Sequence, residues 1–229
     1  MVYGEIEKII GYEFKDKSLL ETALTHSSYA NDILGDRLRS NERLEFLGDA
    51  LLDAAIGECL YYRNKDMSEG ALTKLRADIV CERSLYEAAN EMGLPRFLKL
   101  GNGEKHSGGN LRASMLADAF EALLAAVYLD SNDFKRASAF AVEKLERIID
   151  LACRGKLNYD SKSTLQEKLQ AKGICDIKYV LLSEEGPDHD KIFTFAVLVK
   201  GVEMGRGSGR TKKNAEAAAA LMALSRMEE

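Results

Sequence analysis

The sequence has few prolines and no long apolar run, and each shortage excludes a class of protein. Only two of its 229 residues are proline and no Pro-rich or Ser-rich tract occurs, which argues against an intrinsically disordered chain. No uninterrupted apolar run approaches the roughly 20 residues that a membrane-spanning helix needs. The first residues also lack the basic segment, apolar stretch and small-residue cleavage site of a secretory signal. We therefore expect a folded cytoplasmic protein that does not bind a membrane.

Cysteine is scarce as well. The four cysteines stand far apart in the sequence, with no CxxC pair and no histidine close to any of them. This pattern fits reduced, mostly buried thiols better than a disulfide framework or a zinc site. The residues concerned are Cys59, Cys81, Cys153 and Cys175.

The chain divides into two parts that differ in their pattern of apolar residues. Residues 1–154 repeat apolar positions at steps of three and four, which predicts an all-α domain. Residues 160–229 read as helix, three strands and helix, so we expect an α-β-β-β-α domain after a linker at 155–159. The first part carries the net charge of −5, because residues 160–229 contain 11 acidic and 11 basic side chains. The predicted fold class is thus an all-α domain followed by an α+β domain.

The second part also has recognisable local signals. Ser163 stands three residues before Gln166, a capping-box spacing that predicts a helix start at Ser163. Two segments rich in β-branched and aromatic residues follow, separated by the turn-forming GPDHD. We expect an antiparallel sheet that buries Phe193, Phe195 and Val197 against two helices.

Acidic residues in the first part lack basic neighbours. No Lys or Arg occurs between residues 44 and 62, although Glu42, Glu45 and Asp49 fall within an arc of about 60° on the predicted helix, opposite leucines. A second base-free stretch, residues 113–134, places Asp118 and Glu121 three residues apart. Like charges at helical spacing repel, and hard divalent cations bound through carboxylate oxygens would offset that repulsion. The spacing alone leaves three alternatives open: solvated acids, a metal-dependent nuclease, or another helical metal-dependent phosphohydrolase.

Longer motifs narrow these alternatives. The stretch NERLEFLGDALL at 41–52 resembles the signature of the ribonuclease III family of metal-dependent endonucleases that cut double-stranded RNA. The blocks ALTHSSYAN at 23–31 and ADAFEALLAAVYLD at 117–130 are similar to two further family blocks in the same order. The C-terminal part resembles the double-stranded-RNA-binding domain of that family in LQEKLQ, GPDHDKIF and KKNAEAAAA. The resemblance covers essentially the whole chain.

The resemblance implies a site and a reaction. Glu45, Asp118 and Glu121 match the metal ligands of the family, and Asp49 matches the further catalytic carboxylate, which orients either the water or a metal-bound ligand. The resemblance also implies Mg²⁺ as the cofactor, with Mn²⁺ able to substitute. It implies a homodimer formed through the endonuclease domain. The expected cuts are staggered and leave 5′-phosphate and 3′-hydroxyl ends with short 3′ overhangs. Processing of ribosomal RNA precursors is the implied role. The supporting acids are Glu42 and, near the site of the partner subunit, Glu69.

The resemblance further implies the RNA contacts of the second domain. Double-stranded-RNA-binding domains read the minor grooves and phosphates of an A-form duplex across about 16 base pairs. The matching residues are Gln166, Glu167, His189, Arg210, Lys212 and Lys213. The competing class is a protein that binds duplex RNA without cutting it. Loss of any of the four central acids, which are Glu45, Asp49, Asp118 and Glu121, would have favoured that class.

Three smaller expectations complete the sequence-based description. His26 is expected to be structural rather than catalytic. Asn41 is expected to cap or orient the helix that carries the signature, because Asn is favoured at helix starts. Ser114 is expected to do the same for the helix that carries Asp118.

Overall fold

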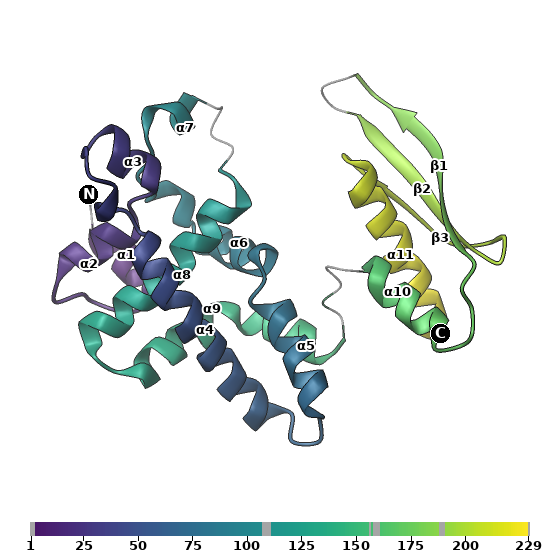
Figure 1. The fold of residues 1–229 in the computed structure, drawn as a ribbon, viewed down its shortest axis with the longest axis horizontal. Helices are drawn as coiled ribbons and strands as arrows, with labels where there is room; N and C mark the ends of the chain where they lie inside the picture. The colour runs from purple at the N-terminus through teal and green to yellow at the C-terminus, as the bar shows by residue number, and fades with distance from the viewer. Residues whose placement is uncertain (1–2, 107–110, 156, 158–160, 188–190, 229) are drawn as a thin grey trace. The chain divides into compact units, whose positions relative to one another are not determined.

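The computed structural model describes residues 3–106, 111–155, 157, 161–187 and 191–228, and the chain separates into two compact units. The first unit spans Met1–Leu157 and the second spans Asn158–Glu229. Of the expected linker at 155–159, only Gly155 and Leu157 lie among the described residues. Each unit has its own cluster of buried apolar side chains. The expected order of an all-α part followed by an α-β-β-β-α part is confirmed (Figure 1).

The described part of the first unit is helical. Its α-helices and short 3₁₀ turns are α1 (Tyr3–Ile10), α2 (Lys17–Ala23), α3 (Ser27–Asp32), η1 (Arg37–Arg39), α4 (Glu42–Arg63), α5 (Glu69–Ile79), α6 (Glu82–Glu91), η2 (Leu94–Arg96), α7 (Asn102–His106), α8 (Ala113–Ser131) and α9 (Phe134–Cys153). Its described residues contain one isolated parallel bridge, between Thr25 and Lys99. None of the helices in the described ranges is long and apolar enough to cross a membrane.

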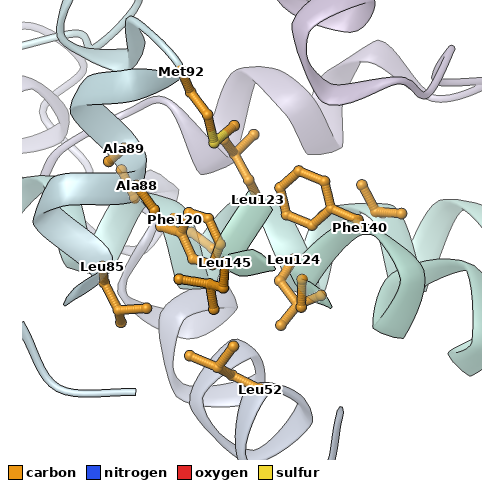
Figure 2. Packing of buried hydrophobic residues seen from close by; sticks show 14 of the residues in the cluster. Leu52, Leu85, Ala88, Ala89, Met92, Phe120, Leu123, Leu124, Phe140 and Leu145 are labelled. Carbon is orange, nitrogen blue, oxygen red and sulfur yellow. The ribbon is translucent and has the colours of Figure 1, made fainter. Parts of the chain in front are cut away.

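Helix α8 lies at the centre of the first unit. It packs against α2, α4, α6 and α9, and every residue from Ala122 to Val127 is buried. Phe120 of α8 stacks on Phe140 of α9 with ring centroids 5.6 Å apart. Figure 2 shows Leu52 of α4 in the same cluster. A helix that is apolar nearly all round must be covered on every side, which explains the surrounding ring of helices.

One carboxylate ties the far end of α8 to the beginning of the chain. The Tyr12 hydroxyl donates a hydrogen bond to Asp130 at 2.6 Å, and the backbone N–H groups of Lys15 and Asp16 donate to it at 2.9 and 2.7 Å. These hydrogen bonds hold the pKa of Asp130 below its usual value, even though burial acts in the opposite direction. Asp130 therefore fixes the turn between α1 and α2 against the core.

The second unit is a three-stranded antiparallel sheet with two helices. Strands β1 (Ile177–Glu185), β2 (Ile192–Val199) and β3 (Val202–Gly209) lie in the order β1-β2-β3, between α10 (Ser161–Gln170) and α11 (Lys212–Glu228) in the sequence. As expected, Phe195 and Val197 are buried and Phe193 packs against the same cluster. The predicted helix start at Ser163 is wrong: α10 begins at Ser161, which is buried and donates a hydrogen bond to the Ala217 carbonyl at 2.6 Å.

Strand β3 packs directly on the backbone of α11 through glycine. A Cβ atom at Gly205 would lie 2.4 Å from the Ala219 oxygen, and one at Gly207 would lie 2.2 Å from the Ala219 nitrogen. Real Cβ contacts are much longer, so only glycine fits here. The alanine-rich sequence of α11 supplies the matching small surface.

The cysteines only partly follow the prediction. All four are free thiols, in agreement with the expected absence of a disulfide framework. Cys175 is exposed and the other three are half-buried, so the prediction of mostly buried thiols is wrong. Burial raises the pKa of Cys59, which makes its thiol less reactive than an exposed one.

Candidate active site

Helix α4 carries three of the predicted acids on its outer side. It buries Leu44, Gly48 and Leu52 toward the core. Glu42 and Asp49 are exposed, whereas Glu45 is half-buried. Because residues three and four apart share one helical face, the three carboxyl groups line one side of the first two turns.

Helix α8 supplies the other two acids. Asp118 and Glu121 are half-buried on a helix whose neighbouring positions, such as Ala117 and Phe120, are buried. A carboxylate in the first half of such a helix loses much of its hydration, and hydration is what normally stabilises its charge. Asp118 and Glu121 are therefore held in an unfavourable environment for negative charge.

Gly48 brings the two helices into contact at the level of the acids. A Cβ atom at Gly48 would lie 2.0 Å from the carbonyl oxygen of Glu121 and 3.0 Å from its Cα. Since no side chain fits there, α4 lies directly on the main chain of Glu121. This contact sets the separation between the acids of α4 and those of α8, and no pattern of spacing in the sequence indicated it.

The four central acids form one electrostatic cluster. The pKa of Glu121 is raised to about 8, first by burial and then by the negative charges of Asp49, Glu45, Asp118 and Asp53. Burial, followed by Asp118, Glu42 and Asp49, raises the pKa of Glu45. The pKa of Asp118 is raised by burial and by the charges of Glu82 and Glu42. The structure therefore brings together Glu45, Asp49, Asp118 and Glu121, which sequence reasoning had grouped.

The carboxylates are near one another without converging on a point. Over the ranges that the structure describes, no three His, Cys, Asp or Glu side chains are arranged closely enough to hold a metal ion as they stand. Four acids without a counter-charge repel one another, which favours separated side-chain positions. The donor set nevertheless fits a hard divalent cation, because its members are all carboxylates. Burial and then the neighbouring negative charges raise the pKa of Glu121, and a bound cation would offset both effects.

The supporting acids lie in different places. Glu42 is at the edge of the cluster, where Arg37 lies 3.3 Å away and the Ser40 hydroxyl donates to it at 3.3 Å. Glu69 begins α5 and accepts a hydrogen bond from Thr73 at 3.1 Å, and it is not among the charges that raise the pKa of the clustered acids. Within this chain Glu69 is therefore separate from the cluster.

Two acids near the cluster were not among the site residues predicted from the sequence. Asp53 acts on Glu121 and also lies 3.4 Å from Arg76 of α5. Its place in the base-free stretch of α4 was the available signal. Glu82, at the start of α6, acts on Asp118. No local pattern marks Glu82, because only the packing of α6 on α8 brings it close.

Neither Asn41 nor Ser114 caps its helix through its side chain, although Asn41 has the expected N-cap position. Asn41 occupies the N-cap position of α4, but its backbone is helical and its side chain makes no capping hydrogen bond. The Asn41 side chain is instead buried, and its Nδ2 has no hydrogen-bond partner. Helix α8 begins at Ala113 with Arg112 as its N-cap, so Ser114 lies inside the first turn. The tertiary contacts of these segments outweigh local capping preference.

Five of the six predicted RNA-binding residues lie among the described residues, and these five are exposed in the second unit. Gln166 and Glu167 lie on the exposed side of α10, opposite the buried Leu165 and Leu169. Lys212 and Lys213 form the first turn of α11, and Arg210 precedes it. The Lys212 ammonium also lies 5.7 Å from the centre of the Phe193 ring. His189 lies outside the described residues.

Family models match both units. A model described as Ribonuclease-III-like matches residues 16–148, and a model of the double-stranded RNA binding motif matches residues 161–227.

Known relatives cover nearly the whole chain. Ribonuclease 3 of Pelotomaculum thermopropionicum is 49% identical over 94% of this chain and 89% of its own length. Ribonuclease 3 of Caldanaerobacter subterraneus subsp. tengcongensis is 48% identical over 97% of this chain and 96% of its own length. A solved nuclease domain of ribonuclease III from Campylobacter jejuni, described as having a region involved in dimer formation, has a TM-score of 0.57 and 40% identity over 62% of this chain and 95% of that domain.

Proposed function

The chain belongs to the ribonuclease III family, and from this membership we propose that it is an endoribonuclease that hydrolyses phosphodiester bonds in double-stranded RNA with the help of divalent metal ions. The observation that carries the proposal is the coupling of Glu121 to Asp49, Glu45 and Asp118 across the contact between α4 and α8. The negative charges of such a cluster repel one another, and bound cations would offset that repulsion. The second unit supplies the means of binding duplex RNA.

Each acid has a distinct part in the proposed reaction. Glu45, Asp118 and Glu121 would hold the metal ions, and Asp49 would orient the attacking water or a metal-bound ligand. A divalent cation bound there lowers the pKa of water and stabilises charge on the leaving oxygen. The half-buried position of Glu121 and Asp118 would reduce the competition of solvent for their oxygens. No side chain has to form a covalent intermediate, and cleavage would leave 5′-phosphate and 3′-hydroxyl ends with short 3′ overhangs.

We propose Mg²⁺ as the working metal, with Mn²⁺ able to replace it. Both ions prefer carboxylate and water ligands, whereas thiolate and imidazole favour softer metals. The four central acids offer only carboxylate oxygens. Ribosomal RNA precursors in the cytoplasm are the proposed natural substrates, in keeping with the family.

The proposed active form is a homodimer through the first unit. Phe46 stands on α4 between Glu45 and Asp49, and 83% of it is exposed. Beside it lies a hollow of about 730 Å³ with Leu19, Leu38 and Leu129 among its lining residues. An exposed aromatic ring next to an apolar hollow suits a two-fold contact in which each ring enters the hollow of the other subunit. Glu69 would then serve the site of the partner.

The proposed RNA contacts follow from exposure and charge. Lys212, Lys213 and Arg210 lie at the N-terminus of α11, where the helix dipole also favours phosphate. Gln166 and Glu167 would lie in a minor groove, where the Gln166 amide can donate or accept hydrogen bonds with 2′-hydroxyl groups and the Glu167 carboxylate can accept them. His189 is proposed for the next minor groove. Such contacts read shape rather than sequence.

Cleavage of an end-labelled RNA duplex tests the proposal. The wild-type protein should cut both strands when Mg²⁺ or Mn²⁺ is present and stop when a chelator is added. Glu121→Gln should bind the duplex with unchanged affinity and lose at least a hundredfold in cleavage rate. Glu58→Gln is the matched control, because Glu58 is an exposed acid on α4, the helix that carries Glu45 and Asp49, and it does not act on Glu121.

Two outcomes would contradict the proposal. Duplex binding by wild type without any cleavage under either metal would favour the alternative, an RNA-binding protein that does not cut. Equal cleavage by wild type and Glu121→Gln would place the chemistry away from the acidic cluster.

A further inference from the structure

His26 caps a short helix, which accounts for only one of its two ring nitrogens. It is the N-cap residue of α3, with φ −67° and ψ 153°, and its Nδ1 accepts the Ser28 backbone N–H at 3.2 Å. The sequence-based expectation of a purely structural histidine explains this nitrogen and leaves Nε2 unused.

A chain of hydrogen bonds fixes the protonation of the ring. The Gly101 N–H donates to the Ser28 hydroxyl oxygen at 2.9 Å, and that oxygen lies 2.8 Å from Nδ1 of His26. Because the backbone of Ser28 already donates to Nδ1, this nitrogen acts as an acceptor and carries no proton. Burial, assisted by Arg112, holds the pKa of His26 below its usual value against the opposing charges of Glu104 and Glu42. The neutral ring therefore carries its proton on Nε2.

His26 lies beside the start of α4, which carries the first acids of the cluster. The Asn41 N–H, directly before Glu42, donates a hydrogen bond to the carbonyl of Thr25, directly before His26, at 2.8 Å. Glu42 also acts electrostatically on His26, on Glu45 and on Asp118. Among the residues that the structure describes, none accepts a hydrogen bond from Nε2. The side chain is half-buried, so its orientation is held while part of it stays open to solvent.

Two of the nearby cations are already paired with acids. Arg37 lies 3.3 Å from Glu42, and Arg112 forms an ion pair with Glu104. A phosphate that approaches an acidic cluster needs donors, and a cationic donor at this edge would be drawn to the carboxylates. A neutral N–H donor avoids that competition, and a hydrogen bond to a charged acceptor is stronger than one between neutral groups.

We propose that Nε2–H of His26 donates a hydrogen bond to a backbone phosphate oxygen of the bound RNA duplex, next to the acidic cluster. The inference rests on the proposed nuclease function and adds an RNA contact on the first unit. It assigns His26 to substrate binding in addition to capping. The proton stays on Nε2 throughout, and no covalent step is involved.

Two amide substitutions separate capping from RNA binding. The amide of His26→Asn reaches the position of Nδ1 and keeps a good N-cap acceptor, but it has no group at the position of Nε2. The amide of His26→Gln reaches the position of Nε2 and loses the cap. Steady-state cleavage of a labelled duplex with Mg²⁺, together with thermal melting of each variant, gives KM, kcat and stability side by side.

We expect His26→Asn to melt like wild type and to raise KM about fivefold to tenfold, the order expected for one hydrogen bond to a charged acceptor. Its kcat should change less than its KM. His26→Gln should melt at a lower temperature and keep a KM closer to that of wild type. Equal KM values for wild type and His26→Asn would overturn this inference alone, whereas absence of cleavage by wild type would count against the proposed function.

Discussion

Gly48 shows how one residue without a side chain controls the position of several that have one. Its backbone lies on the carbonyl of Glu121, so the distance between the two pairs of acids depends on the absence of a Cβ atom. The acids themselves were predictable from the sequence, because a run of carboxylates without Lys or Arg stands out by charge alone. The contact of Gly48 was not predictable in that way, since helical spacing indicates which face is buried and says nothing about how closely the neighbouring helix approaches.

Gly48→Ala should reduce cleavage at least tenfold and lower the melting temperature, because the added methyl group would have to push α8 away from α4. Gly57→Ala is the matched control on the same helix: a Cβ atom there meets only Arg76 Cδ at 4.0 Å. Alanine is also the better helix former, so the control should be neutral or slightly stabilising. Wild-type cleavage and melting in Gly48→Ala would contradict the close contact.

Glu121 predicts a dependence of stability on pH. Its pKa in the folded protein is about 8, above its ordinary value of 4.5, so the folded state binds more protons between these two values. The stability gained by keeping Glu121 neutral is fully present below pH 4.5 and is lost as the pH rises through 8. In a chelating buffer, Glu121→Gln should therefore melt a few degrees above wild type at pH 9 and at nearly the same temperature at pH 4.5.

Adding Mg²⁺ should reverse the order at high pH, because the cation stabilises the ionised wild-type cluster and has fewer ligands in the variant. Differential scanning fluorimetry over this pH range measures both effects. A melting difference between the two proteins that stays constant from pH 4.5 to 9 would contradict the raised pKa.

Strand β3 and helix α11 depend on each other in the same way as α4 and α8. The glycines of β3 alternate, so those that face α11 are Gly205, Gly207 and Gly209, while Arg206 and Ser208 point away from it and are exposed. The last helix was predictable from its alanine-rich sequence. The first two strands were predictable, because two segments rich in aromatic and β-branched residues are separated by turn-forming residues. The glycines of β3 weaken that signal, and only the structure explains them as a surface for α11.

Gly207→Ala should unfold or loosen the second unit, because a Cβ atom would lie 2.2 Å from the backbone nitrogen of Ala219. Duplex binding should fall at least tenfold while the helical content of the first unit persists. Ser208→Ala is the control: it removes only an exposed hydroxyl that lies 2.9 Å from the Thr194 hydroxyl. Unchanged RNA affinity in Gly207→Ala would show that α11 can retreat without loss of the binding surface.

The two units have separate cores, and their charges differ as well. The acid-rich first part carries the net charge of −5, whereas the second part is neutral overall and has exposed cations at the start of α11. This division was visible in the sequence, because the helical spacing of apolar residues in the first part gives way to strand-like segments in the second. The pairing of Asp53 with Arg76 and the effect of Glu82 on Asp118 were not visible, because both arise between helices that are distant in the sequence.

A protein ending at Leu157 should fold on its own core and bind duplex RNA at least tenfold more weakly than the full chain, because affinity for RNA depends on neutralising phosphates. Fluorescence anisotropy with a labelled duplex in a chelating buffer measures the difference. The affinity of the full chain should fall steeply with salt, and that of the shorter protein should already be low. Equal affinity of the two proteins would place the main RNA-binding surface on the first unit.

The hydrogen bonds that Asp130 accepts from Tyr12, Lys15 and Asp16 join two segments that the ribosome makes at different times. The N-terminal helices emerge from the ribosome first, but their buried residues, such as Ile6 and Leu20, belong to the cluster centred on α8. At about 5–20 residues per second, roughly 6 to 25 seconds separate the synthesis of Ile6 from that of Asp130. Until then the apolar faces of the nascent helices have no partner. The nascent first unit therefore exposes apolar surface to chaperones and proteases until α8 and α9, whose residues complete the same cluster, have been made.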